Sequence, residues 1–443
     1  MSMRELARSM ARLAWAAPLY GASRLAEALG GGRSAERLGS SLDAIAWSGH
    51  RRLGWLLQAV FQTGDDLARE WIDRFFDALD GGRSSPLQAA AGLAATAAEA
   101  ARIAAPGAAG GAARQEWRNK LEVYFLVRGA RARLGLPAAG PFDLIPFVER
   151  ALELDPYRAL WVLEGLGHDH AARVLAGDRQ PEDVLDVEGL PPPALLMLHA
   201  GLGMALAEDV LGDLAPVEPD RAAVTAAAER FARLCRANSR RGFADAALES
   251  LGLVTRCFFP DLVPALDRAL RRVPGPLHGY FWHGVGRALY FLPVNFLPGY
   301  GSGHHALAMA RREAPCPQAR RDALTGAVYA LALVNLSHPA VVEDLLRREG
   351  AALDGGAFTE GLVSSLLMRR ATTPDDPGLA TFLAYRPDPS DAALAGRWRE
   401  LVTRPVAEAL DGGRGAPDRG GEVYRALSHP GAFGGLTAGG GVR

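Results

Sequence analysis

The chain has 443 residues, of which 49% are hydrophobic and 22% charged, a composition typical of globular proteins and not of disordered chains. Its formal net charge of −1 provides no overall field that would attract nucleic acid, so we expect no nucleic-acid partner. Three cysteines without a Cys-x-x-Cys pair favour a reducing compartment, and the charged start of the chain lacks the apolar core of a signal peptide. Lysine occurs once, at Lys120, and we attribute the excess of arginine to a GC-rich genome. We therefore predict a bacterial cytoplasmic protein.

Three long runs without charged residues could span a membrane by length alone: 190–207, 288–310 and 323–342. The first has three consecutive prolines near its start, and the second contains two prolines and several glycines, so neither is expected to span. The third ends in polar residues and Pro339, and we predict a buried core helix there. The sequence therefore indicates no integral membrane association.

Residues 1–80 are predicted to form amphipathic helices, because large apolar residues recur at helical spacing up to Gly81. The polar face of this region is acidic, which disfavours lipid binding. We expect its apolar face to pack on the rest of the chain or on a second copy in a homodimer. Residues 82–114 are interpreted as an Ala/Gly-rich linker or a weak helix, and a further helix is predicted over 115–134.

The run Asp65-Asp66-Leu67-Ala68-Arg69-Glu70 resembles the aspartate-rich motif with which class I terpene synthases hold magnesium and diphosphate. The second motif of that family, an Asn followed by Ser or Thr and then Glu at four-residue steps, is missing. We therefore interpret the acidic run as a solvated helix start, where carboxylates interact favourably with the helix dipole.

A repeat begins near Pro141. Six apolar segments carry a small residue in equivalent context, at positions 165, 201, 250, 284, 326 and 361, with separations of 36, 49, 34, 42 and 35 residues. Short and long separations alternate, so the unit is a pair of such helices, present three times. A proline-started segment lies inside each pair, beginning at Pro181, Pro260 and Pro339. This periodicity predicts stacked helical pairs in an αα-solenoid or αα-toroid.

We call these six small residues anchors. Glycine inside a helix costs about 1 kcal/mol relative to alanine, so its repeated use needs a reason. One interpretation is close approach between neighbouring helices. The other is that the small residues leave room for a ligand on a concave inner face, and the two interpretations are compatible.

A polar residue precedes five of the six anchors, where its neighbours are apolar. From this register we predict that Glu164, Glu249 and His283 are catalytic and that at least two of them line one interior polar site. His168, His199, Arg287 and Glu360 are predicted to bind substrate, with Arg287 or His199 as counter-charge. Buried carboxylates and imidazoles suit acid–base chemistry. The alternative is that each polar residue only caps or pairs across a helix interface.

The spacing Glu164-x-x-x-His168 could supply two metal ligands on one helix face, with His199 or His283 as a third. One such pair is a weak signal, and we predict no metal site. No nucleotide-binding, haem-attachment or Gly-x-Ser-x-Gly motif occurs, so the cofactor is left unknown.

The segments Glu164–Gly167, His199–Ala207 and Gly284–Phe291 resemble the UnbL-like proteins, which accompany enediyne polyketide synthases in bacterial gene clusters. The resemblance covers residues 145–300. It implies secondary metabolism and an apolar polyene or related substrate, and it assigns no catalytic residue. A fainter resemblance to the lanthionine-cyclase toroid does not extend to its zinc site, because Cys316 is followed by Pro317 and not by His-Gly.

The sequence thus predicts an all-α protein. Its expected parts are an amphipathic helical region (1–80), a linker (82–114), a helical-repeat domain (115–384, with the repeat from 141), a C-terminal helix (385–411) and a Gly-rich tail (412–443). We expect an enzyme of cyclase or isomerase type that acts on an apolar polyene or isoprenoid-like intermediate by acid–base chemistry. The alternative is a non-catalytic binding or scaffold protein that holds a protein partner on a concave repeat surface.

Overall fold

The computed structural model divides the chain into two compact units. One comprises residues 1–106, 215–220 and 292–301, and almost all of it lies outside the part that the structure describes. The predicted N-terminal helices and the acidic run at Asp65 therefore lie outside the described residues, and so does the Gly-rich tail of the other unit. The helices below belong to the other unit, which comprises 107–214, 221–291 and 302–443. The structure describes residues 108–137, 140–177, 189–214, 219–240, 242–273, 275–292, 295 and 303–411.

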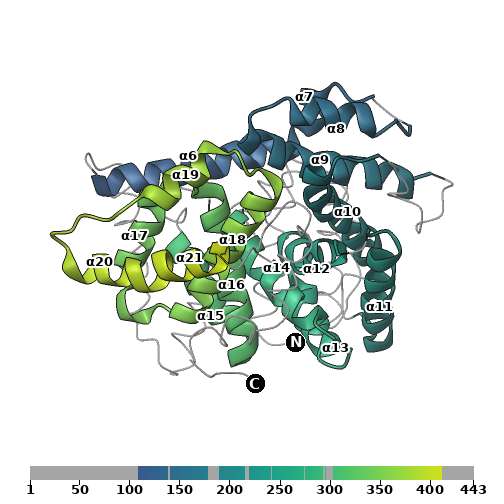
Figure 1. The fold of residues 1–443 in the computed structure, drawn as a ribbon. Coiled ribbons are helices and arrows are strands. Elements are labelled where there is room, and N and C mark those ends of the chain that lie inside the picture. The colour runs from purple at the N-terminus through teal and green to yellow at the C-terminus, as the bar shows by residue number, and fades with distance from the viewer. Residues whose placement is uncertain are drawn as a thin grey trace, which may run out of the picture. The chain divides into compact units, whose positions relative to one another are not determined.

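The described residues are α-helical with short 3₁₀ and π turns, and they contain no β-strand (Figure 1). The all-α class is therefore confirmed. In chain order the elements are α6 (Ala108–Arg128), α7 (Ala130–Leu134), α8 (Ile145–Leu152), α9 (Pro156–Leu175), α10 (Pro192–Gly212), α11 (Arg221–Ala237), α12 (Ala244–Phe258), η2 (Pro260–Leu262), α13 (Val263–Leu270), α14 (Leu277–Phe291), α15 (Gly303–Glu313), α16 (Pro317–Asn335), α17 (Pro339–Glu349), η4 (Gly350–Ala352), α18 (Gly355–Thr372), α19 (Pro377–Ala384), α20 (Ala392–Trp398), the π turn η5 (Arg399–Thr403) and α21 (Arg404–Asp411).

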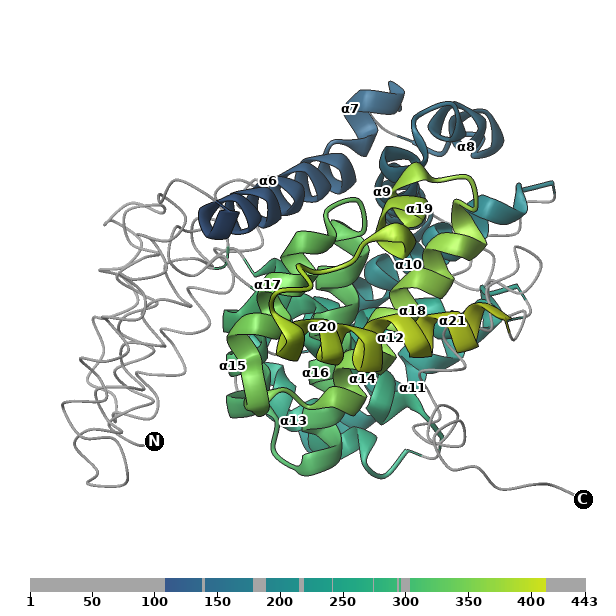
Figure 2. The ribbon, with the colours of Figure 1, turned by 60° about the vertical axis from the view of Figure 1, so that its left-hand side comes forward.

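Six helices, each carrying one anchor, contact one another in chain order: α9, α10, α12, α14, α16 and α18. We call them the central row. Helices α11, α13 and α15 each contact the two row helices that flank them in sequence. Helix α6 lies along the upper edge of these helices in Figures 1 and 2, where it contacts α9, α16 and α17.

Neighbouring row helices approach so closely that most of their contact positions hold glycine. A Cβ on Gly201 of α10 would lie 2.1 Å from the carbonyl oxygen of Glu164 on α9. A Cβ on Gly203 would lie 2.2 Å from the carbonyl oxygen of Ala247 on α12. Glycines at i and i+2 project about 200° apart around a helix, so each faces a different neighbour. The close-approach interpretation of the anchors is confirmed.

The same contact recurs along the row. Gly284 meets α12 and Gly286 meets α16, with built Cβ atoms 2.1 Å and 1.9 Å from the carbonyl oxygens of Glu249 and Ala323. At the one anchor that is a serine, Ser250, the hydroxyl donates a hydrogen bond of 3.0 Å to the carbonyl oxygen of Ala200. A small polar side chain is tolerated there because it bonds to the backbone that glycine would otherwise contact.

This packing decides which side chains share a face. Residues i−1 and i+3 relative to an anchor are four positions apart, so they lie one above the other on the helix. Residue i+1 lies on the opposite side, about 200° from i−1. Every row helix therefore presents its i−1 and i+3 residues to one face of the row, which we call the polar face.

Polar contacts fix α6 on the central row. Asn119 donates a hydrogen bond of 2.9 Å to the side chain of Asn335 on α16, and Asn335 donates one of 3.0 Å to the Tyr290 hydroxyl on α14. The single lysine of the chain, Lys120, is fully buried, with its ammonium 4.7 Å from the centre of the Tyr290 ring. Its charge is balanced by Glu116 at 3.9 Å.

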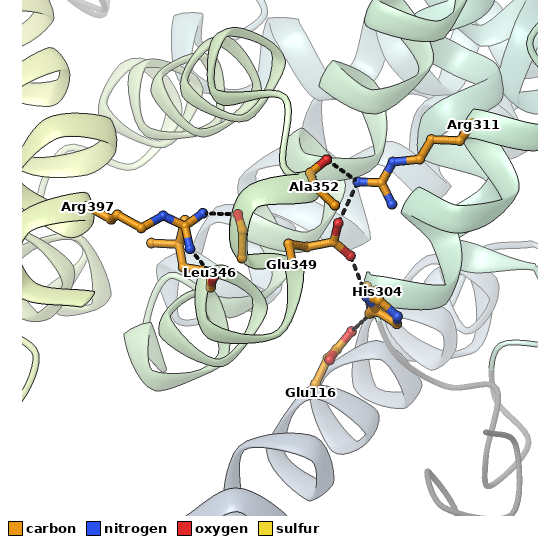
Figure 3. A network of polar contacts seen from close by, with 9 residues as sticks. Glu116, His304, Arg311, Leu346, Glu349, Ala352 and Arg397 are labelled. Atoms are coloured by element: carbon orange, nitrogen blue, oxygen red, sulfur yellow. Dashed lines mark hydrogen bonds and ion pairs between the residues drawn. The ribbon is translucent and has the colours of Figure 1, made fainter. Parts of the chain in front are cut away.

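A second set of polar contacts joins α15 to the end of α17 (Figure 3). The buried Glu349 carboxylate accepts hydrogen bonds from His304 and Arg311 of α15. Arg397 of α20 donates to the carbonyl oxygens of Leu346 and Gly350, at 2.8 Å and 2.7 Å. Burial alone would raise the pKa of Glu349, but the hydrogen bonds and charges of His304 and Arg311 hold that pKa below its usual range.

Several helix boundaries differ from those expected. The helix predicted over 115–134 begins at Ala108 and breaks at Gly129. The C-terminal helix begins at Ala392 and not at 385, and it contains a π turn. Run 190–207 lies largely in α10, whose first-turn prolines are tolerated because the N–H groups there have no intrahelical partner. Among the described helices, α10 alone is long and apolar enough to cross a membrane, and 83% of its apolar window is buried in the protein.

The glycine contacts predict a large asymmetry between two alanine substitutions. In Gly252→Ala the new Cβ would lie 1.8 Å from the carbonyl oxygen of Phe281, so α12 and α14 must move apart. We expect a loss of unfolding free energy of about 1–3 kcal/mol or more. Gly396→Ala in α20 meets nothing within 4 Å and should gain about 0.5–1 kcal/mol from helix propensity. Urea denaturation checks both, and equal effects would contradict the close packing.

Candidate functional site

Four side chains of the polar face meet in one buried cluster. Glu164 comes from α9, Glu249 from α12, and His283 and Arg287 from α14, and none is more than 3% exposed. Arg287 donates hydrogen bonds to both carboxylates, at 2.5 Å to Glu164 and 3.1 Å to Glu249. Glu249 also accepts a hydrogen bond of 2.7 Å from His283 Nδ1. The structure therefore brings together all three predicted catalytic residues with Arg287 as counter-charge.

The small residue Ala200 helps to make this cluster. It occupies the i−1 position of α10, between Glu164 on α9 and Glu249 on α12. Arg287 thereby reaches Glu164 on α9, which is three helices away along the central row. A long side chain at position 200 would project onto the same face. The small side chain of Ala200 therefore leaves room for Arg287.

Glu249 is held ionised by its two partners. Complete burial would raise the pKa of the Glu249 carboxyl group, but the charges and hydrogen bonds of Arg287 and His283 hold that pKa below its usual range. An ionised carboxylate only accepts hydrogen bonds. His283 Nδ1 must therefore carry the hydrogen that it shares with Glu249.

With its hydrogen on Nδ1, a His283 imidazole that carries one proton has Nε2 as its acceptor nitrogen. Nε2 is buried and has no hydrogen-bond partner among the described residues. The hydroxyl Oγ1 of Thr325, on the adjacent helix α16, is also buried without one. The imidazole ring lies 5.3 Å from the Tyr329 ring on α16. The cluster thus has one end that is fully bonded and one nitrogen that is not.

Asp322 was not predicted from the sequence and lies one turn from these groups. It is half-buried on α16, and a Cβ on Gly279 of α14 would lie 3.7 Å from its Oδ2. Burial raises the pKa of Asp322 to about 6. Its position four residues before Gly326 was the available signal, but that spacing does not show burial. Asp322 and Gly279 are both only half-buried at this turn.

The other predicted binding residues lie apart from the cluster. His168 bonds to Glu208 of α10 at 3.1 Å, and Glu360 accepts a hydrogen bond of 2.6 Å from Arg321. Burial lowers the pKa of His168, but Glu208 raises it by more, and the net shift is upward. Both residues are thus in ion pairs between adjacent helices, as the alternative interpretation expected.

His199 is also outside the cluster. Its Nδ1 donates to the carbonyl oxygen of Leu195 at 2.6 Å, and its Nε2 accepts from the backbone N–H of Arg240 at 3.1 Å. Burial lowers the pKa of His199 to about 4, so this imidazole is neutral at pH 7. It does not serve as the counter-charge that the sequence suggested as an alternative to Arg287.

The metal alternative finds no support in the described residues. No group of three His, Cys, Asp or Glu side chains there has the arrangement to hold a metal ion. Glu164 and His168, the pair with ligand spacing, bind different partners.

Comparison of the chain with protein-family models, with curated proteins and with solved structures finds no match. A carboxylate that orients Nδ1 and leaves Nε2 as a proton acceptor is the arrangement that makes histidine a general base.

The buried cluster predicts an unequal response to two matched substitutions. Glu249→Gln removes the carboxylate that His283 and Arg287 share. Glu164, which binds only Arg287, is then the one carboxylate left in the buried cluster. We expect a loss of unfolding free energy of about 3–5 kcal/mol.

Glu360→Gln is the control, because Glu360 has the same register but pairs with the half-exposed Arg321. It should cost about 0–1 kcal/mol. Urea denaturation of both variants at neutral pH measures the difference, and a loss for Glu249→Gln no larger than the control would contradict a buried ion pair.

His199 predicts a pH effect on stability. Its folded pKa of about 4 lies below the usual value, so between pH 6.5 and pH 4 the unfolded chain binds a proton that the folded chain does not. The stability that neutral His199 contributes above pH 6.5 is lost as the pH falls through this window, by about 3 kcal/mol at most. His199→Gln should flatten this part of the pH dependence of unfolding free energy. Parallel curves for the two proteins would show that His199 does not titrate in this way.

Proposed function

We propose that the protein is an enzyme that moves protons on an apolar small molecule, with His283 as its general base. The observation that carries this proposal is the Glu249–His283 pair, in which Nδ1 is bonded and Nε2 is buried without a partner among the described residues. A structural histidine normally uses both nitrogens, as His199 does here. Arg287 keeps Glu249 ionised, and Glu164 balances the remaining charge of Arg287.

The surroundings of the cluster favour an apolar substrate. Around the cluster, the polar face carries the buried Ala200, Leu253 and Tyr329, while its other polar members, among them His168 and Glu360, bind partners outside the cluster. Asp322, one turn from Thr325 on α16, is only half-buried, and its raised pKa suits a carboxyl group that can hold a proton near neutral pH. The resemblance of residues 145–300 to UnbL-like proteins points the same way, to a polyene or isoprenoid-like intermediate of bacterial secondary metabolism.

We also propose that the central row is a helical repeat that curves back on itself as an αα-solenoid or αα-toroid. Helix α9 supports this, because its side chains reach the far members of the row. Glu164 bonds to Arg287 of α14, the Tyr157 hydroxyl donates to the carbonyl oxygen of Val334 on α16, and Arg369 of α18 lies over the Tyr157 ring. A row with these contacts turns its polar face inward.

A second candidate is a non-catalytic scaffold that holds a protein partner. The pairing of both buried carboxylates with Arg287 favours it, because an ion-pair network can serve only to fix helix positions. This candidate gives no role to the unbonded Nε2 of His283. It predicts that replacing His283 changes stability alone.

Proton transfer can be tested by hydrogen exchange from solvent. The protein is incubated in D₂O with pseudoionone, farnesol and farnesene, and deuterium uptake and isomeric products are followed by mass spectrometry. We expect catalysed exchange into at least one compound, and His283→Gln should lower its rate by about 10²–10⁴-fold because the proton acceptor is gone. Glu164→Gln should also abolish turnover while the chain stays folded, because Arg287 then draws Glu249 away from the imidazole.

Glu360→Gln is the matched control and should keep the wild-type rate, since Glu360 pairs with Arg321 outside the cluster. Circular dichroism checks that each variant is folded. Wild-type protein without exchange on any of the three compounds, or His283→Gln with an unchanged rate, would refute the proposed enzyme and favour the scaffold.

A further inference from the structure

The interface between α14 and α16 holds two buried polar atoms without a hydrogen-bond partner among the described residues, His283 Nε2 and Thr325 Oγ1. The two residues are only 3% and 5% exposed. Both stand immediately before an anchor, on helices whose backbones touch: a Cβ on Gly326 would lie 1.9 Å from the His283 carbonyl oxygen. They therefore occupy equivalent positions on the polar face of adjacent helices.

The direction of the imidazole follows from its contacts. Glu249 on α12 binds Nδ1, so the opposite edge of the ring, which carries Nε2, points away from α12. On that side lies α16, where the Tyr329 ring is 5.3 Å from the imidazole. Tyr329 is one turn after Thr325 on the same helix face. His283 and Thr325 therefore lie on adjacent helices across this interface, with the bonded edge of the imidazole turned to α12.

Thr325 differs from other hydroxyl residues in these helices. A helical Ser or Thr commonly donates to the carbonyl oxygen four residues earlier, which satisfies its hydroxyl locally. Residues that do so here are Thr225, Thr255, Ser364, Thr372, Thr373 and Thr381. Thr325 does not, although it is buried, and an unbonded buried hydroxyl costs free energy. Its hydroxyl is thus available to a group that enters the interface.

We propose that Thr325 is a substrate-binding residue whose hydroxyl donates a hydrogen bond to the carbonyl oxygen of a polyene ketone or aldehyde, beside His283 Nε2. This inference rests on the proposed function and names the substrate class of the same site. A carbonyl group is the polar function that fits, because Thr325 can donate to its oxygen while an unprotonated Nε2 accepts a proton from the saturated carbon at the end of the conjugated double bonds.

The step is balanced by the groups on hand. The C–H bond at the saturated carbon that ends the conjugated system breaks, its proton goes to His283 Nε2, and its electron pair moves through the conjugated double bonds to the carbonyl oxygen. The enolate oxygen accepts the Thr325 hydrogen bond, which is stronger for an anion than for a carbonyl group. Return of the proton from Nε2 to another carbon of the chain gives an isomer, and no oxidant or reductant is needed.

Binding measurements separate this inference from the proposed function. Isothermal titration calorimetry compares pseudoionone, a polyene ketone, with farnesene, a polyene hydrocarbon of similar size. The wild-type protein should bind the ketone at least about tenfold more tightly, as expected for one buried hydrogen bond. Thr325→Val should abolish this preference, and Thr325→Ser, which keeps the hydroxyl, should retain it.

Thr325→Val also reports on the free protein. Because the hydroxyl lacks a partner, the isosteric valine should leave the unfolding temperature unchanged or higher. A lower unfolding temperature would show that the hydroxyl has a structural partner and would overturn the inference. So would equal or absent binding of both compounds to wild-type protein, or a preference that survives in Thr325→Val. A ketone preference without hydrogen exchange would instead refute only the proposed catalysis.

Discussion

The close approach of neighbouring helix backbones along the central row is the constraint on which the rest of the structure depends. At Gly286 a Cβ would lie 1.9 Å from the carbonyl oxygen of Ala323, so no larger residue fits without moving the helices. Glycines at i and i+2 must face opposite neighbours, which fixes the rotation of a helix about its own axis as well as its distance. The fixed rotation sends the i−1 and i+3 residues of each row helix to the polar face, and the cluster around Arg287 is a consequence of it.

The same rotation explains how much of the site the sequence could predict. Glu164, Glu249 and His283 share the i−1 register and Arg287 has the i+3 register, so their common face followed from anchor spacing alone. Which of the register-equivalent residues actually meet depends on how the row bends, and local spacing does not contain that information. Glu360 accordingly pairs with Arg321, and His168 with Glu208, each on a neighbouring helix.

His199 does not share this register. It stands at i−2 of Gly201, which rotates it about 100° away from i−1 and toward the side on which α12 packs. There it meets the backbone of Arg240 and the ring of Phe243, just before α12. Asp322 and Thr325 were missed for a different reason: burial and the lack of a hydrogen-bond partner are tertiary properties. The helical class was predictable because periodic apolar residues and capping prolines are local signals.

Burying two carboxylates, an arginine and a histidine is a costly way to hold helices together, since well-packed apolar residues of similar volume often stabilise as well or better. The cluster is better explained as a series of contacts in which each group fixes the charge or proton position of the next, ending at His283. Glu164 takes part of the charge of Arg287, Arg287 keeps Glu249 ionised, and Glu249 fixes the proton of His283 on Nδ1. Each contact fixes the protonation or position of the next group, and among the described residues Nε2 is the one buried side-chain polar atom of this cluster without a hydrogen-bond partner. The facing helix offers a hydroxyl and not a charge at Thr325, so the substrate oxygen that we propose would bind there without breaking an ion pair.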